Sequence, residues 1–261
     1  MKNNIDPLIQ AAYAGGKVIQ NYFGQSLYIE EKSHITDFRT KADIESEEAI
    51  LDILTAAFPD YTVIAEESGL QDKSSPYSLV IDPLDGTNNF VLGIPNFSVS
   101  IGLFHDDEII AGVIYIPILD LLFKAEKGKG AWCNDERLKV NAIKEITKAT
   151  VSYTCGYLKS FQEELPILKR LRGKSIKRYI TNWSPAYDYC LLASGKIEGI
   201  INNENDLYDY AAGKLIAREA GALITTFSGE KQNDKDTSIF LMTNGTEIHQ
   251  EFLEIINAQG Y

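Results

Sequence analysis

The chain has few cysteines, and they form no recognisable metal or disulfide pattern. Three of its 261 residues are cysteine. They are Cys133, Cys155 and Cys190, and no Cys-x-x-Cys pair occurs. An odd and widely spaced set predicts neither a disulfide framework nor a thiolate zinc site. We therefore expect three reduced thiols in the core of a cytoplasmic protein.

Positive charge is also scarce. The 25 Lys and Arg residues are outnumbered by 37 Asp and Glu residues, which gives a formal net charge of −12. Nucleic acids and anionic membranes attract proteins through a basic face, so we expect neither as a partner. The same field would repel an anionic substrate unless bound cations reverse its sign locally.

Long apolar runs are missing as well. The most apolar stretch, residues 109–119, contains Gly112 and Pro117 and is followed by Asp120. It is too short to cross a bilayer and predicts a buried strand. The N-terminal residues lack the apolar core of a signal peptide. These features favour a globular protein without a membrane segment.

Several catalytic signatures are absent. The sequence contains no P-loop, no Gly-x-Ser-x-Gly elbow and no dinucleotide-binding fingerprint. Its three histidines, His34, His105 and His249, show no paired ligand spacing. Any metal should therefore be bound by oxygen, which favours Mg²⁺ or Mn²⁺ over zinc or copper.

The hydrophobic periodicity changes character once along the chain. Helices are predicted at residues 5–23 and 44–58, the second capped by Asp43, with a short helical piece at 87–90. Strands are predicted at 61–65, 78–81, 98–104, 109–116 and 121–125. Farther on, strands at 150–155, 176–180, 197–202, 223–227 and 238–243 alternate with helices at 161–171, 185–194, 208–220 and 247–258. We expect an α+β half over residues 1–142 and an α/β half over residues 143–261, built as layers of helices and sheets.

The most informative segment runs from Leu79 to Phe90. An apolar strand delivers Asp82 to its carboxyl end, and Asp85 follows three residues later. Gly86 lets the backbone approach a ligand, and Thr87 stands where a helix begins. Two carboxylates beside a helix N-terminus suit a hard cation next to an anion. Taken alone, the same residues also fit a plain turn with a threonine cap.

Two further acidic residues stand at the ends of predicted elements. Glu66 comes directly after the strand predicted at 61–65, in the run Glu66–Ser68. Asp209 opens the helix predicted at 208–220. Taken singly, Asp209 is typical of an ordinary first-turn acid that favours the helix dipole.

Together these segments resemble the inositol monophosphatase family of Mg²⁺-dependent, lithium-sensitive phosphatases. The motif Asp-Pro-(Leu/Ile)-Asp-Gly-Thr-x-Asn-Phe matches residues 82–90 at every fixed position, and Glu-Glu-Ser matches residues 66–68. A second motif, Trp-Asp-x-Ala-(Ala/Gly)-Gly, matches residues 208–213 with Tyr208 in place of Trp. The resemblance implies a layered α-β-α-β-α sandwich, a phosphoric monoester hydrolase and a homodimer. It also implies two or three Mg²⁺ ions per active site, with Mn²⁺ as an alternative.

The resemblance also assigns roles to residues. One metal site would be formed by Glu66, Asp82 and the carbonyl of Leu84, a second by Asp82, Asp85 and Asp209, and a weak third with the help of Glu66. Asp43 would pair with Thr87 to orient the attacking water, so Thr87, Asp43 and Glu66 are the expected catalytic residues. The backbone of Gly86 and Thr87 would bind the phosphate.

Substrate choice is expected to depend on two places where the chain departs from its relatives. Residues 183–186 read Trp-Ser-Pro-Ala where many members have Gly-(Ser/Thr)-Ala-Ala, and Asn202 stands where inositol-phosphate-specific members have Glu. The expected substrate contacts are Asp85, Gly86, Thr87, Trp183, Ser184, Ala186 and Asn202. The substrate should be a small phosphate monoester. Fructose 1,6-bisphosphate, histidinol phosphate and a nucleotide such as NADP stay open, as does a non-catalytic regulator that binds metal and phosphorylated ligands.

Overall fold

The computed structural model describes the chain except residues 1–4, 26–28, 32–37, 157–160, 236–237 and 259–261, so His34 lies outside it. Two helices, α1 (Ile5–Tyr22) and α2 (Lys41–Ala57), form the first layer. They pack closely because α1 carries a pair of glycines. A Cβ on Gly15 would lie 2.7 Å from Ile50 of α2, and one on Gly16 would lie 2.5 Å from Tyr115 of the sheet below.

The second layer is an eight-stranded sheet in the order β10-β9-β8-β7-β6-β5-β3-β4. Its strands are β3 (Thr62–Ala65), β4 (Gly69–Gln71), β5 (Tyr77–Asp85), β6 (Ser98–His105), β7 (Glu108–Ile116), β8 (Leu121–Glu126), β9 (Ala131–Cys133) and β10 (Glu136–Arg137). All neighbouring pairs are antiparallel except β3 and β5, which run parallel. A small separate sheet pairs β1 (Ile29–Glu31) with β2 (Phe38–Thr40).

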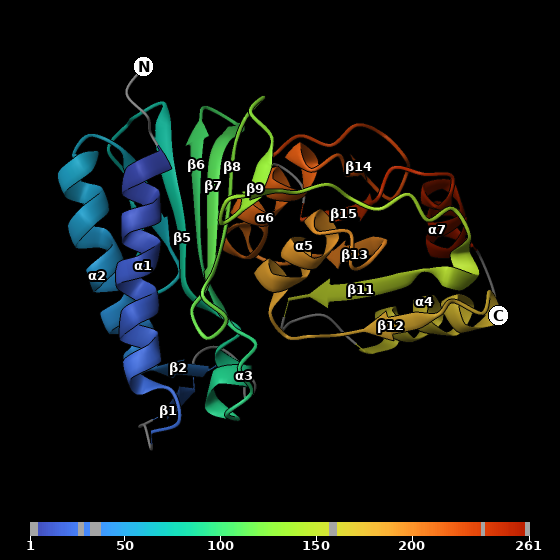
Figure 1. Cartoon of the computed structure of the whole chain (residues 1–261), viewed down its shortest axis with the longest axis horizontal. Coiled ribbons are helices and arrows are strands. Elements are labelled where there is room, and N and C mark those ends of the chain that lie inside the picture. The colour runs from blue at the N-terminus through green and yellow to red at the C-terminus, as the bar shows by residue number, and fades with distance from the viewer. Residues whose placement is uncertain (1–4, 26–28, 32–37, 157–160, 236–237, 259–261) are drawn as a thin grey trace.

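The remaining layers belong to the second half of the chain (Figure 1). Helices α5 (Pro185–Ala193) and α6 (Leu207–Glu219) lie between the two large sheets, and α3 (Thr87–Val91) is a single short helix after β5. The five-stranded sheet has the order β12-β11-β13-β15-β14. Its strands are β11 (Thr150–Cys155), β12 (Arg178–Ile180), β13 (Gly199–Asn203), β14 (Leu223–Thr225) and β15 (Ile239–Thr243), with a 3₁₀ turn at Ile146–Lys148. Helices α4 (Phe161–Gly173) and α7 (Ile248–Asn257) cover its outer face. The expected α-β-α-β-α sandwich is confirmed.

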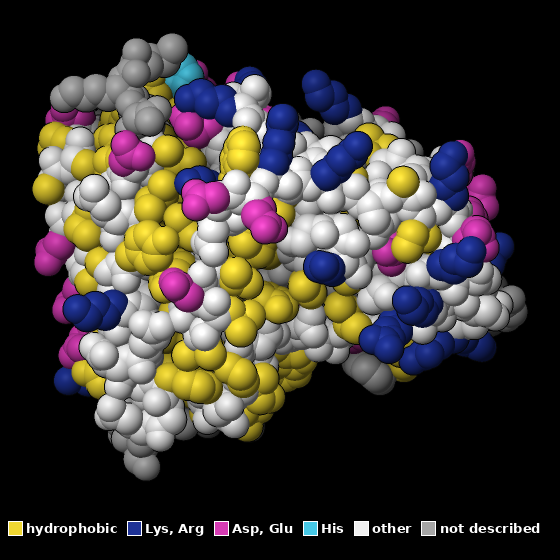
Figure 2. Space-filling model, viewed as in Figure 1, with side chains coloured by type: hydrophobic (Ala, Val, Ile, Leu, Met, Phe, Trp, Pro, Cys, Tyr) yellow, Lys and Arg dark blue, Asp and Glu magenta, His cyan; other side chains and the backbone are white. Residues whose placement is uncertain are grey.

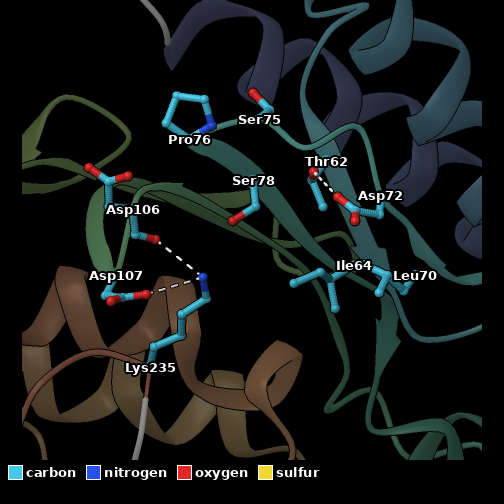
Figure 3. A pocket seen from close by; sticks show the side chains of 10 residues that line it. All are labelled: Thr62, Ile64, Leu70, Asp72, Ser75, Pro76, Ser78, Asp106, Asp107 and Lys235. Atoms are coloured by element: carbon cyan, nitrogen blue, oxygen red, sulfur yellow. Dashed lines mark hydrogen bonds and ion pairs between the residues drawn. The ribbon is translucent and has the colours of Figure 1, made fainter.

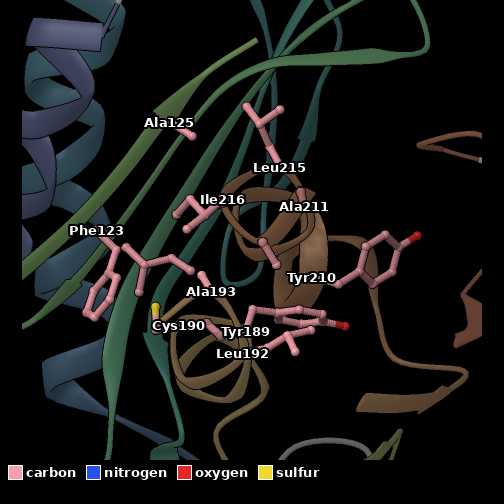
Figure 4. Close-up of a cluster of buried hydrophobic side chains, with 14 of the residues drawn as sticks. Phe123, Ala125, Tyr189, Cys190, Leu192, Ala193, Tyr210, Ala211, Leu215 and Ile216 are labelled. Atoms are coloured by element: carbon pink, nitrogen blue, oxygen red, sulfur yellow. The ribbon is translucent and has the colours of Figure 1, made fainter. Parts of the chain in front are cut away.

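One hydrophobic core joins the two sheets. Figure 4 shows Tyr189 and Leu192 of α5 and Ile216 of α6 beside Phe123 of β8, all in one buried cluster. Helix α6 lies so close to the eight-stranded sheet that a Cβ on Gly112 would meet the α6 backbone at 3.0 Å. The proposed division at residues 142 and 143 stays a prediction, and the two halves share this interior.

The charged side chains are unevenly distributed over the surface. Figure 2 shows Lys and Arg side chains gathered on the side of α4 and β12. Six of the ten residues from 169 to 178 are Lys or Arg, so this strip is locally basic in an acidic protein. Among the described helices, none combines the length and the apolar character needed to cross a bilayer.

Two predictions about local structure are wrong. Helix α2 begins earlier than expected, with Thr40 as its N-cap, and Asp43 is the third helical residue of a capping box. The three cysteines are not all in the core: Cys190 is buried, Cys133 is half-buried and Cys155 is exposed. None of them forms a disulfide.

Candidate active site

Three carboxylates from two distant segments meet at one place. Asp82 and Asp85 lie near the end of β5, and Asp209 lies in the first turn of α6. One oxygen from each lies within 4.8 Å of the others. Helix α6 is brought to this edge of the sheet partly by Ser100 of β6, whose Oγ donates to the carbonyl of Tyr208 at 3.3 Å. The structure therefore assembles the predicted ligands of the second metal.

Glu66 joins this group because β3 and β5 run parallel. The chain leaves β3 beside Asp82, and the N–H of Glu66 donates to the carbonyl of Ile81 at 3.1 Å. A hydrogen bond and the charge of Glu66 both act on the carboxyl of Asp82. The loop that carries Glu66 is held by buried Glu47 of α2, which accepts the N–H groups of Glu67 and Ser68, each at 2.8 Å. No motif in the sequence singles out Glu47 for this role.

The electrostatics of the cluster call for a positive charge. Burial, followed by the nearby Glu66, raises the pKa of Asp82 well above its usual value. Burial and Asp85 do the same to the pKa of Asp209. Burial raises the pKa of Asp85 to about 6, although hydrogen bonds from Ser184 and the Ala186 N–H oppose it. Clustered buried oxygen donors of this kind fit Mg²⁺ or Mn²⁺ rather than a softer metal.

Asp85 receives hydrogen bonds from both halves of the chain. Ser98 Oγ of β6 donates to Asp85 Oδ2 at 3.0 Å, and Ser184 Oγ donates to the same oxygen. The Ala186 N–H donates to Asp85 Oδ1 at 3.3 Å. Ser184 and Ala186 are both buried and contact Asp85 directly. Their shared neighbour Pro185 has no N–H to offer, which suits the first turn of α5.

A buried hydroxyl–carboxylate pair lies beside the acidic cluster. Thr87 Oγ1 is 3.0 Å from Asp43 Oδ1 and 3.0 Å from the carbonyl oxygen of Leu84. Its single proton can serve only one of these acceptors at a time. The other oxygen of Asp43 accepts from the N–H and the hydroxyl of Thr40 at 2.7 and 2.6 Å. The capping box of α2 therefore fixes the carboxylate that faces Thr87.

The turn into α3 depends on glycine. Gly86 has a φ of +91°, in the left-handed region, and a Cβ there would lie 2.9 Å from the carbonyl oxygen of Asn96. Ser46 Oγ of α2 holds the preceding Pro83 carbonyl at 2.9 Å. Within the described chain, the N–H groups of Gly86 and Thr87 donate to no acceptor. They are available for a ligand.

The two residues expected to select the substrate are placed very differently. Trp183 has a φ of +56°, and 55% of its surface is exposed. Asn202 is fully buried: its Oδ1 accepts from Thr154, Tyr189 and Asn205, and its Nδ2 donates to the carbonyl of Ser238. Because these bonds occupy both ends of the amide, the structure does not support a substrate contact by Asn202. Its place in the packing of β13 against α5 explains its burial.

His105, His249 and one surface hollow lie outside the acidic cluster. His249 is buried between Thr225 and Thr243, and His105 stacks on Tyr77. A hollow of about 440 Å³ is lined in part by Asp106, Asp107 and Lys235. Lys235 Nζ lies 3.3 Å from Asp107 Oδ1 and donates to the carbonyl of Asp106 (Figure 3). No residue of the acidic cluster lines it. The functional site is therefore defined by converging side chains rather than by the size of a cavity.

The inositol monophosphatase family model matches residues 2–260. The chain belongs to this family. Nus factor SuhB from Pasteurella multocida (strain Pm70) is 37% identical over 226 residues, covering 85% of this chain and 84% of that protein. Fructose-1,6-bisphosphatase/inositol-1-monophosphatase from Aquifex aeolicus (strain VF5) is 36% identical over 220 residues, covering 82% of each. The solved structure of the extragenic suppressor protein suhB from Bartonella henselae has a TM-score of 0.89 at 30% identity, covering 98% of this chain and 99% of that one.

Membership in the inositol monophosphatase family confirms the predicted class of enzyme. The chain is a phosphoric monoester hydrolase with the family's mixed α/β fold. The names of its relatives differ in substrate and extend to a Nus factor, so they leave the substrate of this chain open.

Proposed function

We propose that this protein hydrolyses a small phosphate monoester with two or three Mg²⁺ ions per active site. The observation that carries the proposal is the convergence of Asp82, Asp85 and Asp209 beside the Thr87–Asp43 pair. Glu66, Asp82 and the Leu84 carbonyl would hold one ion, the three aspartates a second, and Glu66 would help to hold a weak third. When bound, such ions lower the pKa of an attacking water and stabilise the leaving alkoxide.

The Thr87–Asp43 pair would position the water. Asp43 is held on the side away from Thr87 by the backbone and hydroxyl of Thr40, so it presents a fixed acceptor. When the Leu84 carbonyl is engaged elsewhere, the proton of Thr87 points to Asp43. The lone pairs of Thr87 Oγ1 are then free to accept a hydrogen bond from the attacking water, and a proton taken from that water would be balanced by transfer of the Thr87 proton to Asp43. No covalent intermediate on the protein is required.

The phosphate would be bound by backbone rather than by basic side chains. The available N–H groups of Gly86 and Thr87 adjoin the carboxylates, so an anion and a cation can be held side by side. This arrangement also removes the difficulty posed by the net charge of −12, because the local charge becomes positive only when metal is present. Phosphate binding should therefore depend steeply on Mg²⁺.

The leaving group would be selected at Trp183 and the segment that follows it. The exposed indole offers a flat apolar face that can stack on a base or on one side of a sugar ring. Ser184 and Ala186 would contribute by setting the position of Asp85. Because Asn202 is engaged inside the protein, we propose that inositol 1-phosphate is not the preferred substrate by a wide margin. Fructose 1,6-bisphosphate, histidinol phosphate and NADP are the alternatives to compare.

A substrate panel tests this proposal directly. Phosphate release is measured from inositol 1-phosphate, fructose 1,6-bisphosphate, histidinol phosphate, NADP and 3′-phosphoadenosine phosphate, with Mg²⁺, without it, and with added Li⁺. We expect release that requires Mg²⁺ and is inhibited by Li⁺. Release that is unchanged in excess chelator would refute the metal mechanism, and a clear preference for inositol 1-phosphate would refute the inference drawn from Asn202.

A second candidate function comes from a relative named a Nus factor. A regulatory protein of this fold would bind a partner without needing turnover. Absence of metal-dependent phosphate release from every compound of the panel would favour it over catalysis.

We also propose a cytoplasmic homodimer. The apolar side chains of Leu92 and Ile94, 72% and 45% exposed just after α3, are a candidate contact. Light scattering on the wild type and on a Leu92→Glu variant tests that contact. We expect a dimeric wild type and a monomeric variant. A variant that stays dimeric would exclude Leu92 from the interface.

A further inference from the structure

Residues 182–184, here named the α5 lead-in, are hydrogen-bonded to the motif at residues 82–90, here named the metal motif. Asn89 of α3 donates from Nδ2 to the carbonyl of Asn182 at 2.7 Å and to that of Asn96 at 2.8 Å. Asn96 Nδ2 donates to the same Asn182 carbonyl at 3.1 Å. The lead-in ends at Ser184, whose hydroxyl is bonded to Asp85. Both ends of this short segment are thus bonded to the half of the chain that carries Asp82 and Asp85.

A buried carboxylate on α5 anchors the other side of the lead-in. Asp188 Oδ1 accepts from Asn182 Nδ2 at 2.5 Å, and Asp188 Oδ2 accepts from Ser152 Oγ of β11 at 2.5 Å. Asp188 and Ser152 are fully buried. A continuous hydrogen-bonded chain therefore runs from the five-stranded sheet, through Asp188 and Asn182, to Asn89 in the metal motif.

The lead-in needs such an anchor because its middle residue is strained. Trp183 adopts a φ of +56°, a left-handed conformation that is unfavourable for any residue with a Cβ. The conformation persists because Asn182 and Ser184 are both bonded on either side of it. It turns the indole to the surface while its neighbour Ser184 stays fully buried against Asp85. Releasing Asn182 would let the segment relax and draw Ser184 away.

We propose that Asp188 is a positioning residue of the active site, which holds the lead-in so that Ser184 orients Asp85 and Trp183 faces the substrate. This inference rests on the proposed phosphatase function. Asp188 bonds Asn182 and Ser152 rather than the acidic cluster, although the charge of Asp85 acts on its carboxyl. Asn182→Ala leaves both charges in place, so this variant tests the effect that passes through Asn182. The competing explanation is that Asp188 only secures the packing of α5 on β11.

Metal binding distinguishes these explanations without reference to turnover. Isothermal titration with Mg²⁺ is compared for the wild type, Asp188→Asn and Asn182→Ala. An asparagine can bond Ser152 and Asn182 but without charge assistance, so this variant should fold. We expect both substitutions to weaken Mg²⁺ binding by about tenfold, as loss of a partner that orients a ligand does. Glu198→Gln is the matched control, since Glu198 is equally buried and bonded to Asn141 and Thr150 but is not part of this chain of bonds.

A rescue variant separates positioning from packing. Glycine accepts a positive φ without penalty, so Trp183→Gly removes the strain that the anchor resists. We expect Asp188→Asn combined with Trp183→Gly to bind Mg²⁺ more tightly than Asp188→Asn alone. If Asp188 only supports α5, the loss in the double variant will equal that in the single one, and the proposal fails. It also fails if Asp188→Asn and Asn182→Ala bind Mg²⁺ as the control does.

Fluorescence gives an independent reading of the lead-in. The chain has two tryptophans, so Trp132→Phe leaves Trp183 as the only one. In that background, Asp188→Asn should change the emission maximum of Trp183, and Glu198→Gln should not. An unaltered emission in Asp188→Asn would overturn the proposal. The proposed function is tested separately, because it fails if the wild type releases no phosphate with Mg²⁺ or releases it equally in excess chelator.

Discussion

Ser184 Oγ donates a hydrogen bond to Asp85 Oδ2, so the N-cap residue of α5 bonds a carboxylate of β5 instead of its own helix. The Ala186 N–H of the same helix donates to the other oxygen of Asp85. Asp85 thereby supplies the negative group that a helix N-terminus favours. A proposed metal ligand in one half of the chain and the start of a helix in the other are stabilised by the same contacts.

Replacing Asp85 should separate activity from stability. Asp85→Asn removes a metal ligand while an amide can still accept from Ser184, so we expect turnover to fall by at least about a hundredfold with the circular dichroism spectrum unchanged. Near-normal turnover would contradict the assignment of Asp85.

The same variant should be more stable than the wild type in the absence of metal. Burial raises the pKa of Asp85 to about 6, above that of the unfolded chain. The protonated carboxyl therefore favours the folded wild type at low pH, and this stabilisation is lost as the pH rises through about 6. Asp85→Asn has no carboxyl to ionise, so its stability does not fall for this reason. The melting temperature of metal-free Asp85→Asn should exceed that of the wild type more at pH 8 than at pH 5. A difference in melting temperature that does not grow with pH would show that the pKa of Asp85 is not raised.

Mg²⁺ affinity should rise with pH. The raised pKa values of Asp82, Asp85 and Asp209 mean that metal displaces protons from the cluster below neutral pH. Titration with Mg²⁺ at pH 6 and pH 8, in buffers of different ionisation enthalpy, should show weaker binding and more proton release at pH 6. Equal affinity at both values would show that these carboxylates do not hold the ion.

Thr87 should be needed for turnover more than for metal binding. Thr87→Ala removes the hydroxyl that lies 3.0 Å from Asp43, and we expect kcat to fall by about 10²- to 10⁴-fold. Thr87→Ser keeps the hydroxyl and should retain most of the activity. Titration with Mg²⁺ is the control, because neither variant removes a carboxylate. Comparable kcat values for the two variants would rule out the role of the hydroxyl.

Lys214 should stabilise the fold through its contacts with Asn233 and Phe240. This fully buried residue of α6 donates to the Asn233 carbonyl at 2.8 Å and lies 5.0 Å from the centre of the Phe240 ring. Lys214→Met leaves that carbonyl without its donor, so the free energy of unfolding should fall by about 1–3 kcal/mol. Urea unfolding measures it, with Lys144→Met as the exposed control.

The loss in free energy of unfolding caused by Lys214→Met should also depend on pH. Burial lowers the pKa of Lys214 to about 7, below that of the unfolded chain. The wild type therefore gains stability from this residue as the pH rises from about 7 to 10, whereas Lys214→Met does not. The difference between the two proteins should be larger at pH 9 than at pH 7. A constant difference would show that the folded-state pKa is not depressed.

The sequence predicted those elements that repeat a pattern over a sufficient length. Strand β11 was expected at 150–155 and is found there, and α1 differs by one residue at its end. Strands β4, β9 and β10 were missed because two or three residues at a sheet edge show no periodicity. Strand β5 continues to Asp85, past Pro83, where a bulge absorbs the irregularity.

The metal motif could be predicted because its residues are close in sequence, and its supports could not. Glu47 bonds the N–H of Glu67 across 20 positions, and Asp188 holds Asn182 through a turn that contains a strained Trp183. Such bonds depend on tertiary packing and leave no local signature. The burial of Asn202 could not be predicted for the same reason, because nothing in the neighbouring sequence reveals the three donors that surround its Oδ1.

Helix α2 sets a spacing within the active site. Asp43, which faces Thr87, and Glu47, which holds the loop of Glu66, are four residues apart on one helix and both are buried. Their separation along the helix axis is fixed at about 6 Å by the helical rise per residue. The geometry of α2 therefore sets the distance between the Thr87–Asp43 pair and the loop that carries Glu66. Changes of length between Gln71 and Tyr77 should leave it intact, whereas one residue inserted within α2 between Asp43 and Glu47 would rotate the two carboxylates onto different faces.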